Sequence, residues 1–260
     1  MNFAIYRRPM ALLAAAALTL GANAANAQIF SAPTKPAAPA APAPRPATAP
    51  AAAPAAAPRP AATAAAAPAG TYRVRGFRNA QFGMTRDQVI AAIATDFRIT
   101  PDKIQTTVNP QDRTTSLVIK VPSIDPGPGE ATVTYFIGAR TQRLIKVALI
   151  WIKAGEPSVD DRQTLLNDGG MFSTYFHNQS WTPNAFRENT PIGPNALVLF
   201  VGQDPAGATV EVDAQGINFT AQQDGKAVPT PPAKGPSVLV VSYTLDPAHP
   251  DVYQIPPGAF

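Results

Sequence analysis

The chain has 260 residues, 30 prolines, no cysteine and a formal net charge of +4 at pH 7. A sequence without cysteine excludes disulfides, thiolate metal sites, cysteine nucleophiles and lipid attachment at a signal-cleavage site. All 17 acidic residues follow residue 70, whereas five basic residues precede it: Arg7, Arg8, Lys35, Arg45 and Arg59. Residues 71–260 therefore carry 16 positive and 17 negative charges without a basic cluster, which argues against binding of nucleic acid.

Residues 1–27 have the pattern of a secretory signal peptide. Arg7 and Arg8 form a basic start, residues 10–20 are apolar, and the segment ends in small residues at Ala25-Asn26-Ala27. The apolar run is short for a membrane span. We therefore expect export to the periplasm, without lipid attachment and without a stable membrane span after cleavage.

Residues 31–70 consist almost entirely of alanine and proline. Without larger apolar side chains such a segment cannot offset the entropy lost on folding, so we expect residues 28–70 to form a disordered linker. A proline-rich chain extends by about 3.1 Å per residue, which lets this linker reach on the order of 100 Å. It becomes a free tail if the signal is cleaved and a membrane tether if the signal is retained.

The first strong folding signal is a capped helix that begins after Thr85. Gln88 is placed to complete a capping box with Thr85, and Asp87 suits the positive end of the helix dipole. Apolar residues then recur at helical spacing through Phe97. Capping accounts for Asp87 and Gln88 without a catalytic role, and we expect Val89, Ile93 and Phe97 to be buried.

Strand signals follow this helix in close succession. An extended segment over residues 72–75 precedes it, and strands are expected at residues 105–108, 115–121, 131–139 and 143–153. The last of these is apolar on both faces, with Ile150 and Ile152 alternating with Leu149 and Trp151. Such a strand is either covered on both sides or presents one face as a binding surface.

A second helix is expected after Ser158, with Asp161 at the reciprocal capping position and an interruption at Gly169-Gly170. Further strands are expected around residues 185–188, 197–202, 209–219 and 238–245, the third bent or split near residues 213–216. Residues 224–236 are rich in Pro, Gly and Lys and are expected to form a loop, and the tail after residue 246 is expected to be irregular.

The order of these elements predicts an α+β fold in which antiparallel sheet packs against helices. Residues 71–260 are expected to form a single α+β domain. The same order also fits a tandem α-β4-α-β4 arrangement of two similar halves, at about 71–155 and 156–260.

Phe82-Gly83-Met84-Thr85, followed by Gln88-Val89, resembles the start of helix-first periplasmic modules. These are the BamE/SmpA-type module and the tandem β-lactamase-inhibitor-protein fold. The resemblance implies helices packed on an antiparallel sheet and a function in binding other proteins rather than in catalysis. BamE-type proteins are lipoproteins with an N-terminal cysteine, and inhibitors of the second fold carry disulfides. This chain has neither feature.

No residue pattern assigns catalytic, cofactor-binding or metal-binding residues. His177 and His249 lack metal-ligand spacing, and Ser173 and Ser180 beside His177 lack a nucleophile elbow. The acidic pair Asp160-Asp161 fits a helix start, and Glu130 and Glu188 are isolated. No phosphate-binding or dinucleotide-binding glycine motif occurs.

Two further readings concern binding. Trp151, Trp181, Tyr135 and Phe136 could form an aromatic platform for a sugar or peptide, although such residues more often belong to a core. The expected function is a non-enzymatic envelope binding or assembly module that recognises another envelope protein or a cell-wall component. Alternatives are a hydrolase of peptidoglycan or polysaccharide that uses carboxylates such as Glu130 and Glu188, or a structural envelope protein.

Overall fold

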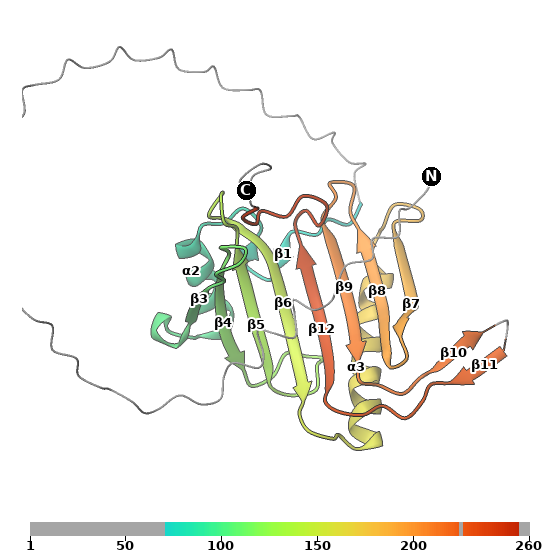
Figure 1. Ribbon diagram of the computed structural model, residues 1–260. Helices are drawn as coiled ribbons and strands as arrows, with labels where there is room; N and C mark the ends of the chain where they lie inside the picture. The colour runs from blue at the N-terminus through green and yellow to red at the C-terminus, as the bar shows by residue number, and fades with distance from the viewer. Residues whose placement is uncertain (1–70, 224–225, 255–260) are drawn as a thin grey trace, which may run out of the picture. The chain divides into compact units, whose positions relative to one another are not determined.

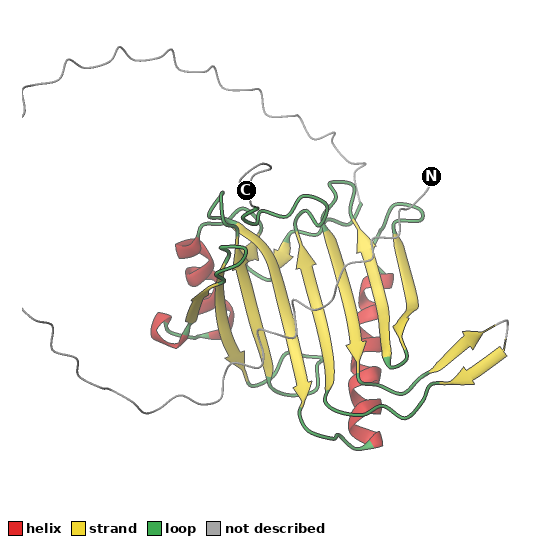
Figure 2. Cartoon of the chain, in the orientation of Figure 1, coloured by secondary structure: helices red, strands yellow, loops and turns green. Residues whose placement is uncertain are grey.

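The computed structural model describes residues 71–223 and 226–254, which form two α-helices and one large antiparallel sheet (Figures 1 and 2). The fold of these residues is therefore α+β, as expected. The predicted signal peptide at residues 1–27 and the linker at residues 28–70 lie outside the described residues.

The sheet has eight strands in the order β3-β4-β5-β6-β12-β9-β8-β7, and each neighbouring pair is antiparallel. Their bounds, in sheet order, are Gln105–Val108, Thr115–Val121, Ala131–Ile137, Leu144–Lys153, Ser237–Thr244, Thr209–Gln215, Ala196–Gln203 and Phe186–Gly193. The sheet is continuous because β6 pairs with β12 over eight residues. The last strand of each run therefore lies at the centre.

Helix α2 spans Arg86–Phe97 and begins as predicted. The Thr85 side chain accepts a hydrogen bond from the Gln88 backbone N–H, and the Gln88 side chain accepts one from the Thr85 backbone N–H at 2.8 Å. Val89 and Ile93 are fully buried. Phe97 differs from the expectation because it is only partly buried at the end of the helix, where it stacks on Phe77.

Helix α3 spans Val159–His177 and has the predicted capping box between Ser158 and Asp161. It continues through Gly169-Gly170, so the expected interruption is wrong. A side chain at Gly169 would overlap Leu199 and Leu239 of the sheet, whereas Gly170 faces open space. Gly169 therefore allows close packing of helix on sheet rather than ending the helix.

Both helices lie on the same side of the sheet (Figures 1 and 2). Their buried side chains share one hydrophobic core with the sheet residues that face them. In the central strands these sheet residues are Val147, Leu149 and Trp151 of β6 and Leu239 and Val241 of β12. The core is thus built from one face of the sheet, and the other face has no described helix over it.

Two short hairpins complete the fold. Strands β1 (Gly76–Phe77) and β2 (Ala80–Gln81) pair just before α2, and a 3-10 turn, Pro101–Lys103, follows it. Strands β10 (Thr220–Gln223) and β11 (Lys226–Pro229) form a two-stranded sheet of their own, which projects from the end of β9 (Figure 1). Part of the expected loop 224–236 is therefore a strand of this arm.

The tail after β12 has no regular structure in its described part, as expected, but Asp251 anchors it. The Asp251 carboxylate accepts hydrogen bonds from the backbone N–H groups of Arg140 and Thr141 in the β5–β6 turn, at 3.0 and 2.9 Å. Gly138 lies against this carboxylate, where a side chain would overlap it. The tail is therefore held on the sheet by a buried acid.

Candidate functional site

The sheet face opposite the helices, here called the open face, is the largest feature that the core leaves unused. The register of the ladder assigns its residues, because directly paired residues share a face. Its central members, from β4 to β8, are Val118, Phe136, Ile150, Ile152, Val238, Val240, Glu211, Asp213, Val198 and Val201.

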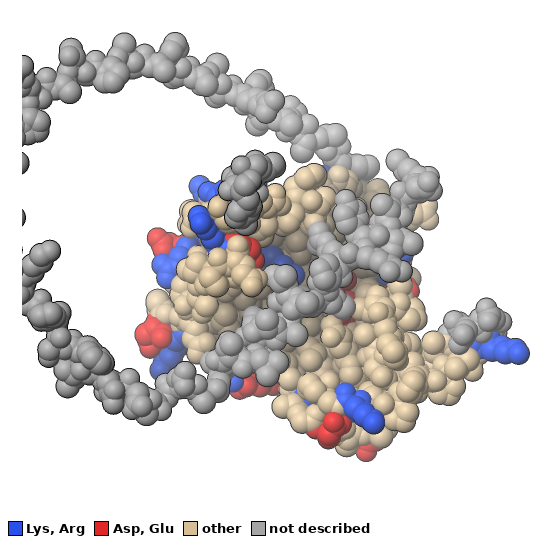
Figure 3. Space-filling model, viewed as in Figure 1, with Lys and Arg blue, Asp and Glu red and all other residues tan. Residues whose placement is uncertain are grey.

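The centre of the open face is apolar or small. Ile150 pairs with Val240 and Ile152 with Val238, whereas Ala148 pairs with Ser242. Ile152 is 44% exposed. Figure 3, which views the molecule from this side, shows that the visible described part is mostly uncharged. Ile150 and Val238 are half-buried, and Ala148, Val240 and Ser242 are buried, so the apolar character of β6 on this side reaches solvent mainly at Ile152.

An acidic pair interrupts the apolar character of the open face. Glu211 and Asp213 are two residues apart on β9, so both side chains belong to this face. Asp213 is 6% exposed, and its Oδ1 atom has no hydrogen-bond partner. Burial and the neighbouring Glu211 carboxyl raise the pKa of Asp213 well above its ordinary value. Neither residue is among the catalytic or binding candidates expected from the sequence.

Positive charges on the open face come from β4, the central strand β6 and the edge strand β7. Lys120 of β4 forms an ion pair with Glu130 at 3.4 Å. The Lys146 ammonium of β6 lies 5.8 Å from the centre of the Phe136 ring. Arg187 of the edge strand β7 pairs with Val201 of β8. None of the salt bridges among the described residues includes Glu211 or Asp213.

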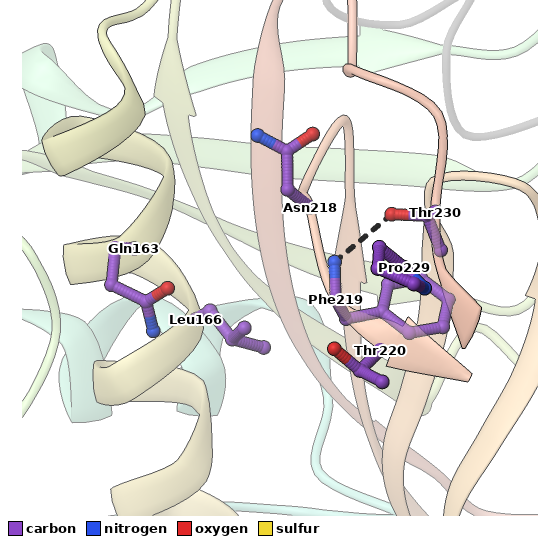
Figure 4. A pocket seen from close by; sticks show the side chains of 7 residues that line it. All are labelled: Gln163, Leu166, Asn218, Phe219, Thr220, Pro229 and Thr230. Carbon is purple, nitrogen blue, oxygen red and sulfur yellow. Dashed lines mark hydrogen bonds between the residues drawn. The ribbon is translucent and has the colours of Figure 1, made fainter. Parts of the chain in front are cut away.

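A shallow pocket of about 390 Å³ lies where the β10–β11 arm meets α3 (Figure 4). Gln163 and Leu166 line it from the helix, and the arm contributes Asn218, Phe219, Thr220, Pro229 and Thr230. The Phe219 backbone N–H donates to the Thr230 hydroxyl at 3.0 Å. Because this lining contains no charged or titratable side chain, the pocket has groups for contact and hydrogen bonding but none for acid–base chemistry.

The base of the arm is fixed by a buried arginine. The Arg162 guanidinium of α3 is 4% exposed and donates to the carbonyl oxygens of Gly216 and Gly235 and to the Ser237 hydroxyl. It also pairs with Glu156 at 3.3 Å. Since Gly216 precedes the arm and Gly235 follows it, this one side chain holds both ends of the insertion.

The structure brings His177, Ser173 and Glu188 together, but not as a hydrolase triad. The Ser173 hydroxyl lies within hydrogen-bond distance of both the Leu199 carbonyl oxygen, at 3.1 Å, and Glu188 Oε1, at 3.2 Å. His177 Nδ1 lies 3.0 Å from Glu188 Oε2. The carboxylate therefore stands between the serine and the histidine, whereas a triad needs the histidine to accept the serine proton. Ser180 contributes its backbone carbonyl to the N–H of Tyr72.

The other predicted polar residues are dispersed. Glu130 precedes β5 and Glu188 lies on β7, five strands away in the sheet order. At about 4.8 Å per strand this separation is on the order of 24 Å, far beyond the spacing of paired glycosidase carboxylates. Asp161 caps α3, and the exposed His249 pairs with Asp246 at 3.2 Å.

The aromatic residues considered as a platform do not share a surface. Trp151 and Tyr135 are buried in the core, and neither Trp151 Nε1 nor the Tyr135 hydroxyl has a hydrogen-bond partner among the described residues. Trp181 packs on Tyr72 with ring centroids 4.8 Å apart, and its Nε1 donates to the Phe176 carbonyl oxygen. Phe136 is on the open face. The platform hypothesis is therefore wrong, because alternation along the strands separates these rings.

Within residues 71–223 and 226–254, no group of three or more His, Cys, Asp or Glu residues is arranged to hold a metal ion. No helix in the same part of the chain combines the length and apolar character needed to cross a membrane. Comparison with protein-family models, with curated proteins and with solved structures finds no match to the chain.

Proposed function

We propose that this chain is an exported envelope protein that binds another protein through its open face, without catalysis. The observation that carries the proposal is the apolar centre of that face, with Ile150 and Ile152 opposite Val240 and Val238 and no described helix above them. Of these four, Ile152 is exposed, Ile150 and Val238 are half-buried and Val240 is buried, so the surface offered to a partner centres on Ile152. Adjacent apolar side chains that reach solvent are typical of protein interaction sites.

Export rests on the N-terminal pattern, with Arg7 and Arg8 before an apolar run and Ala25-Asn26-Ala27 at its end. Mass spectrometry of the mature protein tests it. A mature N-terminus near Gln28 is expected for a cleaved signal. Retention of residues 1–27 would instead favour the tether and would contradict cleavage.

We further infer that the two halves of the sheet are tandem α-β4 units. In support, α2 precedes β3 to β6, α3 precedes β7, β8, β9 and β12, and the two sets meet in mirrored order at β6 and β12. This element order agrees with the tandem arrangement that the resemblance to the β-lactamase-inhibitor-protein fold implies. Binding by a sheet face agrees with that resemblance, although function does not follow from architecture alone.

A separate protein is a better occupant than a second copy of this chain. The open face presents two carboxyl groups near its centre, and a partner must supply positive charge to match them. Of the cations on this face, Lys120 is already paired with Glu130, and the central Lys146 lies over the Phe136 ring of its own chain. A second copy would therefore bring few cations to the centre.

The test is capture of a partner from an envelope extract by the full chain, with two matched variants. Ile152→Lys places a charge on the open face, and Val159→Lys places the same charge on α3, where Val159 is 71% exposed. We expect Ile152→Lys to lower capture of one specific protein by about tenfold or more and Val159→Lys to leave it unchanged. Equal capture by both variants would overturn the proposal.

A further inference from the structure

Glu211 and Asp213 on β9 face side chains from the neighbouring strands that carry no charge. The residues that pair with Asp213 on the neighbouring strands are Val240 and Val198, and those that pair with Glu211 are Ser242 and Val201. An ionised carboxylate can only accept hydrogen bonds, and the neighbours of Asp213 on the adjacent strands offer aliphatic groups. On its own strand Asp213 lies between Gln215 and Glu211, and it shares a side-chain hydrogen bond with Glu211. Asp213 Oδ1 is accordingly left without a partner.

We propose that Glu211 and Asp213 together form the binding site for an arginine side chain of the protein that docks on the open face. The inference rests on the proposed function, because it names the chemistry of the partner at that same surface. The site is defined by the two carboxyl groups and by the aliphatic side chains of Val198 and Val240 beside them.

Arginine fits this site for geometric and chemical reasons. Residues two apart on a strand have Cα atoms about 7 Å apart, so one planar guanidinium with five donors can reach both carboxylates. Guanidinium is weakly hydrated and suits an apolar surround better than the strongly hydrated ammonium of lysine does. The aliphatic stem of the arginine would pack on the two valines.

The charged groups that face the pair define its expected pH dependence. On its own strand Asp213 lies next to Glu211, which raises its pKa. The Lys146 ammonium of β6, across β12, lowers it. Arg187 lies two strands from Glu211, beyond Val201, and Lys120 is paired with Glu130 at the far flank. A bound guanidinium favours the ionised form of Asp213, so binding should lower the pKa of this carboxyl and strengthen as pH rises through its free value.

The experiment is an NMR titration of the full chain with ¹³C-labelled aspartate, in which the Asp213 carboxyl is assigned by Asp213→Asn. The titration is recorded alone, with n-butylguanidinium chloride, and with its neutral analogue n-butylurea plus equal sodium chloride. We expect the guanidinium to lower the Asp213 midpoint by about 0.5 pH unit or more and n-butylurea to leave it unchanged. Glu211→Gln should reduce the shift at least about twofold, since half of the site is neutralised.

Three outcomes would overturn the inference. One is an unchanged midpoint, and another is an equal shift with n-butylurea and salt, which would indicate screening only. The third is a dimer of the chain that dissociates on both Arg187→Gln and Asp213→Asn, since a second copy would then supply the arginine.

The two proposals fail separately. If capture depends on Ile152 but the Asp213 midpoint does not move, the docking face is retained and the arginine site is rejected. A guanidinium-dependent shift without capture of any protein would retain the cation site and reject the proposed function.

Discussion

Asp251 offers a sharp test of how the tail is held. Arg140 donates to Asp251 Oδ1 from its backbone N–H and from Nε, at 3.0 and 3.3 Å. Thr141 donates to Oδ2 from its backbone N–H and its hydroxyl, at 2.9 and 2.5 Å. Burial by itself raises the pKa of Asp251, but these four hydrogen bonds outweigh it and hold the pKa at about 2.

The free energy at stake follows from this pKa. The side chain of Asp251 is 11% exposed, so solvent screens the interaction little. The difference between the ordinary value of 3.8 and the pKa of about 2 corresponds to about 2.4 kcal/mol of stability. Because the folded-state pKa is lowered, this contribution is fully present well above pH 3.8 and is lost as pH falls through about 2.

Urea unfolding of the full chain, followed by tryptophan fluorescence, measures the effect. Asp251→Asn should lower the free energy of unfolding by about 2.4 kcal/mol at pH 7 and by about 1.3 kcal/mol at about pH 3, where part of the wild-type contribution is already lost. The matched control is Asp246→Asn in the same tail, whose side chain is 49% exposed and should matter by less than about 1 kcal/mol. A loss below about 1 kcal/mol at pH 7, or one that is equal at both pH values, would refute the reasoning.

Five other substitutions test the helices by unfolding, one of them also by amide exchange. Gly169→Ala should destabilise the chain by about 1–3 kcal/mol by overpacking against the sheet, whereas Gly170→Ala should stabilise it by about 0.5–1 kcal/mol; equal effects would contradict the packing role. Arg162→Leu should cost about 3 kcal/mol and speed amide exchange in residues 217–236, because the base of the arm loses its donors; unchanged exchange would show that the arginine does not hold the arm. Thr85→Ala and Ser158→Ala should each cost about 1 kcal/mol, and no loss in either would deny the capping boxes a role in stability.

The helices and most strands could be predicted because their signals are local. A threonine or serine followed three residues later by a residue that can bond back to it specifies a helix start, and both capping boxes form. The strands at residues 105–108 and 115–121 match the expectation because alternation is a property of neighbouring residues.

The predictions fail where contacts between residues distant in sequence determine the local structure. Gly169-Gly170 reads as a helix breaker until Leu199 and Leu239 are known to lie against the first glycine. The Pro-rich and Gly-rich composition of residues 224–236 hides β11, which is fixed by pairing with β10 and by hydrogen bonds at the base of the arm. The central pairing of β6 with β12 joins segments about ninety residues apart, and no local pattern specifies it.

The acidic pair could have been found from the sequence. Residues 209–215 alternate, with Val210, Val212 and Ala214 on one face and Glu211 and Asp213 on the other. That pattern predicts two carboxyl groups on the face away from the core. It does not predict their aliphatic neighbours, Val240 and Val198, because those residues come from other strands. The chemical character of the site therefore depends on the strand order.

A carboxyl group kept in such surroundings should lower the stability of the free chain. The pKa of Asp213 is raised in the folded state, so the folded chain holds this proton more tightly than the unfolded chain does, and stability falls as pH rises from about 4 towards the raised value. Asp213→Asn removes the titration, so the variant should be more stable than the wild type at pH 8 by a margin that shrinks at pH 5. Urea unfolding at the two pH values measures that margin, and Asp251→Asn, whose loss should be equal at pH 5 and pH 8, serves as the control. If the same variant also loses the guanidinium response, stability has been exchanged for binding, as expected of a functional residue. A variant less stable than the wild type at pH 8 would mean that the carboxylate is compensated within the free chain, and the reason to expect an arginine from a partner would disappear.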